Sequence, residues 1–160
     1  MTPYPLPSEV LDQRTRELAL PSTIPGPKTG EVVVAVDRAV RVALPLAELA
    51  GICLMTPIAR IPGAAPHILG LMLAMERRWL TVDVGALLGH APPRQRDGAG
   101  HALLLRHGPV ALAVERAESI QCPPMMLPST NLYLVQGVAA DGLLMLNAAA
   151  VLAAVCKGVP

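Results

Sequence analysis

Short runs in which apolar residues recur at every second position cover most of the chain, and this period is typical of β-strands. Residues 32–36 and 40–44 flank a turn at 37–39 and predict a hairpin. Helical patterns are few: a turn at 45–50, a turn at 85–88 that Asp83 caps, and an alanine-rich helix over 148–155. The predicted strands cover residues 32–36, 40–44, 52–55, 71–75, 79–84, 102–106, 110–115, 119–121, 133–138 and 143–146. Many short strands with little helix predict an all-β architecture of small barrels.

Proline and glycine mark two irregular segments. Residues 1–30 contain six prolines, which bracket one predicted helix over 8–20, and we interpret this segment as an appendage that docks on the domain or on a partner. Residues 92–100 read PPRQRDGAG and are rich in turn residues. We therefore expect two small barrels packed together, one over about 31–90 and one over about 101–156, with a linker over about 91–100.

The composition narrows the class of protein. The chain has 160 residues and a formal net charge of +1, which argues against a nucleic-acid partner, because nucleic-acid binding needs a basic surface. Hydrophobic residues make up 52% but aromatic residues only 2%, so the core has to consist of aliphatic side chains. The longest apolar stretches, 61–75 and 142–156, are shorter than the ~18 residues of a membrane span, so we expect no direct membrane insertion.

Candidate catalytic or metal-binding groups are sparse. The three cysteines have no metal-ligand spacing and read as reduced thiols of a cytoplasmic protein, and residues 1–7 do not resemble a secretory leader. The four histidines (67, 90, 101 and 107) have no ligand spacing either. We expect no enzyme activity, no cofactor and no metal. The alternative from another class is a small β-barrel enzyme or ligand binder, which a polar cavity near His90 and His101 would support.

Several motifs occur in the order of a known family. The segment IPGAAPHILG (61–70), followed by a hairpin that ends in TVDV (81–84), resembles the CheW-like domain of bacterial chemosensory systems, where V-P-x-x-P-x-x-V-x-G, N-L-R-G and P-V-x-D-L follow one another. ALPLAELAGI (43–52) is similar to the family's a-I-P-V-x-x-V-x-E-V. ALAVE (111–115), QGV (136–138) and LLMLN (143–147) resemble its later strands. The resemblance covers about residues 31–156.

The resemblance implies a fold and a role. The fold would be two five-stranded SH3-like barrels around a shared hydrophobic seam. The role would be that of a non-enzymatic adaptor, which couples the cytoplasmic tips of chemoreceptors to the regulatory domain of a CheA-type histidine kinase. That kinase domain is itself CheW-like, so other CheW-like domains or a second copy of the chain are further implied partners. The implied location is the cytoplasm, at membrane-associated receptor arrays where receptors are bound.

The chain departs from the family where receptors are expected to bind. By resemblance, Leu49, Gly51, Ile52, Met75 and Glu76 occupy the receptor groove. The family's Glu falls on Gly51, its Arg on Met75 and the Gly of N-L-R-G on Glu76, so both characteristic charges are lost. The alternative hypothesis is therefore a diverged member that binds kinase regulatory domains or associates with itself, without engaging receptors.

The next residues of the hairpin are further interface candidates. Trp79 is the only tryptophan, and by alternation it shares the outer face of its strand with Thr81 and Asp83, as an interface anchor would. The alternative is that Trp79 closes the seam between the two barrels. Arg77 and Arg78 either steer an acidic partner or form an exposed polar turn.

Overall fold

The computed structural model describes residues 30–96, 98–129 and 133–157, so the helix predicted over residues 8–20 lies outside the described part. Its helical segments are η1 (Leu46–Glu48), α2 (Val84–Leu87) and α3 (Ala148–Lys157). Its strands are β1 (Val32–Asp37), β2 (Val40–Pro45), β3 (Leu49–Leu54), β4 (Ile58–Ala59), β5 (Ile68–Ala74), β6 (Arg77–Asp83), β7 (His101–Leu105), β8 (Val110–Val114), β9 (Arg116–Gln121), β10 (Met126–Pro128), β11 (Val135–Ala139) and β12 (Leu144–Leu146).

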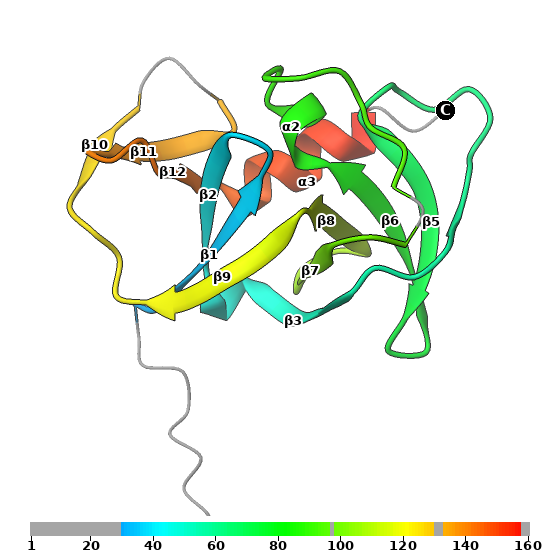
Figure 1. Ribbon diagram of the computed structural model, residues 1–160, viewed down its shortest axis with the longest axis horizontal. Helices are drawn as coiled ribbons and strands as arrows, with labels where there is room; N and C mark the ends of the chain where they lie inside the picture. The colour runs from blue at the N-terminus through cyan, green and yellow to red at the C-terminus, as the bar shows by residue number, and fades with distance from the viewer. Residues whose placement is uncertain (1–29, 97, 130–132, 158–160) are drawn as a thin grey trace, which may run out of the picture.

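The strands form two six-stranded sheets that pack together (Figure 1). The first sheet has the order β10-β11-β12-β2-β1-β9, and the second has the order β3-β7-β8-β6-β5-β4. Neighbouring strands are antiparallel except for β12 with β2 and β6 with β8, which pair in parallel. The sixth strand of each sheet is a short edge strand, β4 or β10. The all-β class and the C-terminal helix are thus confirmed.

The predicted division of the chain at residues 91–100 is wrong. The first sheet combines β1 and β2 with β9 to β12, whereas the second is made of the middle strands β3 to β8. The segment 92–100 therefore connects two parts of the second barrel, α2 and β7, and we call it the strap. Its turn residues mark a break in regular structure and not a boundary between barrels. The parallel pairings of β12 with β2 and of β6 with β8 join strands that are distant in the sequence, which local periodicity does not reveal.

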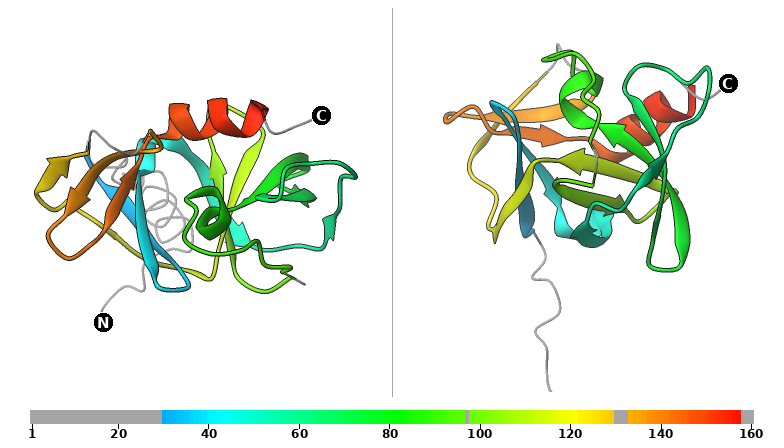
Figure 2. Two further views of the ribbon diagram at one scale, coloured as in Figure 1. Left: turned by 90° about the horizontal axis from the view of Figure 1, so that it is seen from above. Right: turned by 45° about the vertical axis from the view of Figure 1, so that its right-hand side comes forward.

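A central core fills the space between the two sheets. Side chains of β1 and β2 in the first sheet pack there against β6, β7 and β8 of the second, and α3 covers the junction (Figure 2). The largest fully buried members are aliphatic: Val33, Val42, Leu44, Val82, Leu103, Leu105, Leu112 and Leu146. Two smaller clusters fill the barrels themselves, one around Trp79 and Leu104 and one around Val34 and Leu143. The core is aliphatic, as the composition predicts.

A group of buried charges joins the two sheets beside this core. Asp37 at the end of β1 and Asp83 at the end of β6 are both fully buried. Arg96 of the strap, whose side chain is 5% exposed, forms an ion pair with Asp37, and Arg38 Nη2 lies 3.0 Å from Asp83 Oδ2. We call these four residues the charge clasp. Two buried carboxylates are thus matched by two guanidinium groups, which buried charges require.

Backbone amides complete the clasp. Asp37 Oδ2 accepts a hydrogen bond from the amide of Gly85, and Asp83 Oδ1 accepts one from the amide of Ala86, each at 3.0 Å. The second bond confirms that Asp83 caps the helical turn that follows it. The amide of Arg94 donates to Asp83 Oδ2 at 3.1 Å and fixes the strap. Each carboxylate therefore accepts hydrogen bonds from both an arginine side chain and a backbone amide at the start of α2, and these bonds allow both carboxylates to be buried.

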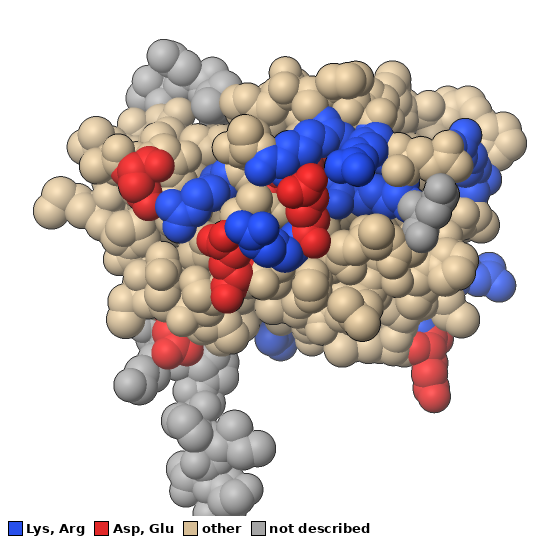
Figure 3. All heavy atoms as spheres, in the orientation of Figure 1, with Lys and Arg blue, Asp and Glu red and all other residues tan. Residues whose placement is uncertain are grey.

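The face that carries β9 and the strap has charges of both signs. Figure 3 shows basic side chains gathered across the middle of this face with acidic side chains between them. The exposed ion pairs are Arg41 with Asp141 at 2.7 Å, Arg116 with Glu118 at 3.0 Å and Arg94 with Glu115 at 3.4 Å. The Arg41 guanidinium, hydrogen-bonded to Asp141, lowers the pKa of that carboxyl. This face is therefore a mixed polar surface.

Candidate partner-binding surface

The hairpin between β5 and β6 ends in a tight turn. Ala74 pairs with Arg77, which leaves only Met75 and Glu76 in the loop. Both are left-handed, with φ angles of 49° and 58°. Two-residue loops of this kind favour Asn-Gly, because a side chain in this conformation costs about 1–2 kcal/mol. The tip is thus built from two residues that tolerate this conformation poorly, and such strain often marks functional positions.

Met75 lies against Gly51 of β3, a strand that pairs with neither β5 nor β6. A Cβ atom built on Gly51 would lie 2.5 Å from Met75 Cε and 3.4 Å from its Sδ, so the methionine occupies the space that a larger residue at 51 would need. Met75 nevertheless keeps 58% of its surface exposed. The hairpin tip and β3 therefore meet through a thioether on a glycine, which is an adaptable apolar contact.

Exposed apolar and charged residues surround this contact. Leu73, two residues before Met75 on β5, is 61% exposed, and its carbonyl accepts a hydrogen bond from Thr56 Oγ1 at 3.0 Å. Glu76 is exposed at the tip. We call Gly51, Leu73, Met75 and Glu76 the tip surface. It combines apolar residues with a single charge at the rim, as protein interfaces commonly do.

Comparison with known proteins gives the family. The family model described as CheW-like domain matches residues 31–155. The chain belongs to this family. Among solved structures, the crystal structure of the scaffolding protein TtCheW from Thermoanaerobacter tengcongensis superposes with a TM-score of 0.63, covering 78% of this chain and 88% of that chain. Its sequence is 14% identical, so this likeness concerns the fold, two SH3-like barrels. No curated protein matches the chain.

The Gly51–Met75 contact can be compared with the CheW-like family pattern at the same two positions. The family pattern has Glu at the first of these positions and Arg at the second, and the structure brings the two positions into direct contact. The resemblance thus places the family's acidic and basic residues at two positions that here carry uncharged residues packed on each other. Three of the five predicted groove residues, Gly51, Met75 and Glu76, therefore form one surface.

Leu49 and Ile52, the other two predicted groove residues, differ from the expectation of an exposed site. Leu49 is 3% exposed and belongs to the central core, so the expectation that it is exposed is wrong. Ile52 is partly buried and packs on the same core. The pairing of β3 with β7 shifts register between Leu49 and Gly51, which changes the side of the strand on which residues lie. This irregularity has no signal in the sequence pattern.

Both predicted positions of Trp79 are wrong. Trp79 is 2% exposed and lies in the cluster that fills the second barrel, neither on the outer face nor at the seam. Its Nε1 donates a hydrogen bond to the carbonyl of Ala74 at 2.9 Å. Alternation misled because both faces of β6 are covered: Val82 packs in the central core, whereas Trp79 packs in the cluster that fills the second barrel. Thr81 and Asp83 are buried as well.

Arg77 and Arg78 are both exposed on β6. The guanidinium carbon of Arg77 lies 5.5 Å from the centroid of the Trp79 ring, a cation–π distance, so Arg77 covers the tryptophan. Arg78 pairs with Leu73 across the hairpin and stands next to the tip surface. Of the three interface candidates, Arg78 is thus the one whose position beside exposed apolar residues suits steering of a partner.

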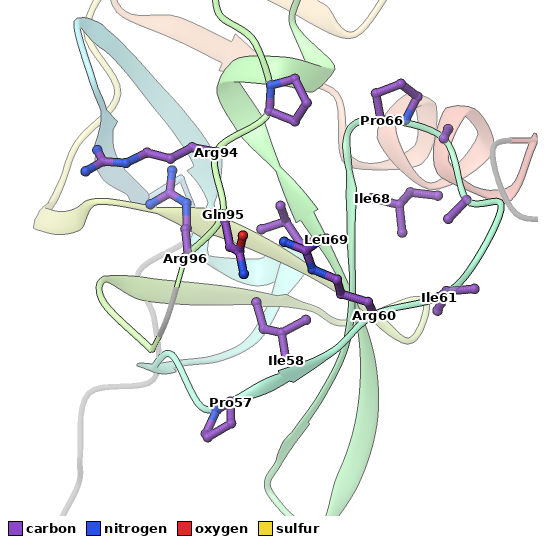
Figure 4. Close-up of a pocket in the computed structure, with 13 residues that line it drawn as sticks. Pro57, Ile58, Arg60, Ile61, Pro66, Ile68, Leu69, Arg94, Gln95 and Arg96 are labelled. Carbon is purple, nitrogen blue, oxygen red and sulfur yellow. The ribbon is translucent and has the colours of Figure 1, made fainter.

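A cleft of about 670 Å³ lies elsewhere on the second barrel (Figure 4). Its walls are the segment 57–69 and the strap, and its lining includes neither His90 nor His101, where a cavity would have supported an enzyme. No local pattern in the sequence marks this cleft, because its two walls lie about thirty residues apart in the chain. His67 adjoins one wall, and burial lowers its pKa.

Within residues 30–96, 98–129 and 133–157, no cluster of three or more potential metal ligands occurs. No helix in this described part is long and apolar enough to span a membrane. Burial raises the pKa of the Cys53 thiol, which makes this cysteine a weaker nucleophile.

Proposed function

We propose that this chain is a non-enzymatic adaptor of a chemosensory system, which couples chemoreceptor tips to the regulatory domain of a CheA-type histidine kinase. The observation that carries the proposal is the CheW-like match over residues 31–155, together with a two-barrel fold shared with a CheW scaffolding protein. Two barrels offer separate surfaces, so one molecule can hold two partners at once. The kinase domain and the receptor tip are the partners that membership in this family suggests.

A second candidate function is favoured by the Gly51–Met75 contact. Gly51 and Met75 carry no charge, so these two positions cannot form the ion pairs with a receptor helix that an acidic and a basic residue there would form. Under this candidate, the chain joins kinase regulatory domains or other CheW-like domains to one another, or associates with itself, and does not bind receptors. Exposed Leu73 and Met75 are consistent with such an apolar contact.

The two candidates are separated by binding measurements with purified components from the same organism. The full chain is titrated with the kinase regulatory domain and, separately, with a receptor cytoplasmic fragment. Binding of both supports the coupling adaptor, and binding of the kinase domain alone supports the second candidate. Binding of neither contradicts both.

A pair of variants tests the tip surface directly. Gly51→Glu with Met75→Arg restores both family charges at positions that touch in the structure. Under the second candidate, the double variant gains receptor binding that the natural chain lacks. Arg116→Gln, an exposed change on β9 in the other sheet, is the matched control and leaves binding unchanged.

A further inference from the structure

We propose that the cleft beside the strap is a ligand site for a small aliphatic carboxylate. The carboxylate would be held by Arg60 and Gln95, and its apolar part would lie on Ile58, Ile68 and Leu69. This site is separate from the tip surface and independent of the adaptor function proposed above.

The walls of the cleft are held in place without a ligand. On one side, the loop after β4 is closed by two turns, in which the amide of Ala64 donates to the carbonyl of Ile61 and the amide of Ile68 to that of Ala65. On the other side, the charge clasp fixes the strap through the buried Arg96. A preformed site spares a ligand the entropic cost of ordering the protein.

The charged side chains that line the cleft are all positive. Three arginines and one glutamine are among the lining residues, and no carboxylate lies among the described ones. Arg94 and Arg96 are already engaged, with Glu115 and with Asp37. Figure 4 shows their side chains directed away from Arg60. Arg60 therefore provides the charge that a ligand would meet.

Arg60 and Gln95 face each other across the cleft. In Figure 4 the Arg60 side chain extends from the wall after β4 toward Gln95 on the strap. A guanidinium and a carboxamide both donate hydrogen bonds, and a carboxylate is a compact acceptor for two such donors. The electrostatics thus select an anion with a planar group of two oxygens.

The remainder of the lining is aliphatic. Ile58, Ile68 and Leu69 line the cleft, and Pro57, Ile61 and Pro66 belong to the same wall. The volume of about 670 Å³ lies within the usual range for small-molecule sites. An apolar floor beside a single cation suits an acid with an alkyl chain better than a highly charged phosphate, whose charge needs several donors.

The test is a titration of the full chain with octanoate, followed by NMR of the isoleucine methyl groups and the Gln95 side-chain amide. We expect saturable shifts at Ile58, Ile68 and Gln95. Octanol, which lacks the charge, and acetate, which lacks the chain, should each bind at least about tenfold more weakly, as loss of a charge-assisted hydrogen bond or of apolar burial implies.

Variants assign the binding to the named residues. Arg60→Gln keeps a long polar side chain without the charge, and should weaken octanoate binding by about tenfold. Arg78→Gln, an exposed arginine on β6, is the matched control and should bind as the natural chain does. The proposal is overturned if no saturable shift occurs up to about 10 mM octanoate, if octanol binds as well as octanoate, or if Arg60→Gln binds unchanged.

Discussion

Met75 Cε lies 2.5 Å from the position that a Cβ atom of residue 51 would take, so the identities of these two residues are physically coupled. In the CheW-like pattern the same two positions carry opposite charges, whose attraction would draw the hairpin tip toward β3. Here an apolar contact joins the same two elements. The geometry of the two-barrel fold can thus be retained while the chemistry offered to a partner changes.

A double-mutant cycle measures this coupling. Gly51→Ala alone forces the flexible end of Met75 to move, and the cost offsets the gain of about 0.4–1 kcal/mol that Ala otherwise brings by restricting the unfolded chain. With Met75→Ala as background, that gain should reappear. We expect a coupling free energy of about 0.5 kcal/mol or more from urea unfolding. Strict additivity of the two changes would contradict the contact.

Relief of strain at the hairpin tip should stabilise the protein. Glu76→Gly removes a side chain from a residue with φ of 58°, and the gain exceeds the added freedom of the unfolded chain. We expect a net increase of about 0.5–1 kcal/mol in the free energy of unfolding. Arg78→Gly, within β6, is the control and should destabilise by a similar amount. A destabilising Glu76→Gly would show that the turn is not strained.

Two arginines of the strap should differ sharply in importance. Arg96→Met removes a buried partner from Asp37, and should lower the free energy of unfolding by about 3–5 kcal/mol. Arg94→Met removes only an exposed pair with Glu115 and should cost less than about 1 kcal/mol. Chemical unfolding of both variants gives the comparison. Equal effects would mean that the clasp does not hold the sheets together.

Stability should fall at mildly acidic pH because of His67. Burial lowers the pKa of His67 below its ordinary value of 6.5, so below this pH the unfolded chain binds more protons than the folded one. The stability that neutral His67 contributes is complete above pH 6.5 and is lost as the pH falls through the lower folded pKa. His67→Gln should flatten this dependence in urea midpoints measured across this range.

The control for this pH experiment is His90→Gln, at an exposed histidine that follows α2. It should retain the pH dependence of the natural chain. If His67→Gln retains it as well, the loss of stability has another source.

Much of the fold follows from local pattern. Alternation predicted β1 with β2 and β7 with β8 within a residue or two. It also predicted the hairpin of β5 with β6, but left residues 76–78 as its turn, whereas the turn is Met75 and Glu76 and β6 begins at Arg77. It missed the first residues of β9, Arg116 to Glu118, because an exposed strand has no apolar alternation. The motif order was enough to give the family, which the match over residues 31–155 confirms.

What the sequence did not reveal depends on contacts between distant residues. Asp37 and Arg96 stand 59 positions apart, one in a predicted turn and one in a predicted linker, so neither reads as part of a buried pair. The burial of Trp79 follows from packing against both faces of β6, and that of Leu49 from a register shift in β3. The family pattern indicated that positions 51 and 75 matter, but it did not indicate that the two residues touch.

Because the first sheet combines strands from both ends of the domain, the order of synthesis affects the order of folding. When a ribosome has made residues 31–115, every strand of the second sheet is present, but β1 and β2 still lack β9 and β12 on their flanks. The hairpin of β1 and β2 is synthesised first but pairs with β9 and β12, which are synthesised later. Its apolar face therefore remains exposed to solvent until those strands are available. A chain truncated at residue 115 should accordingly protect amides in β3 to β8 from hydrogen exchange while leaving β1 and β2 exchangeable. We therefore expect the second barrel, built from the consecutive strands β3 to β8, to fold first. The first barrel, whose strands come from both ends of the domain, should fold only when the chain is complete.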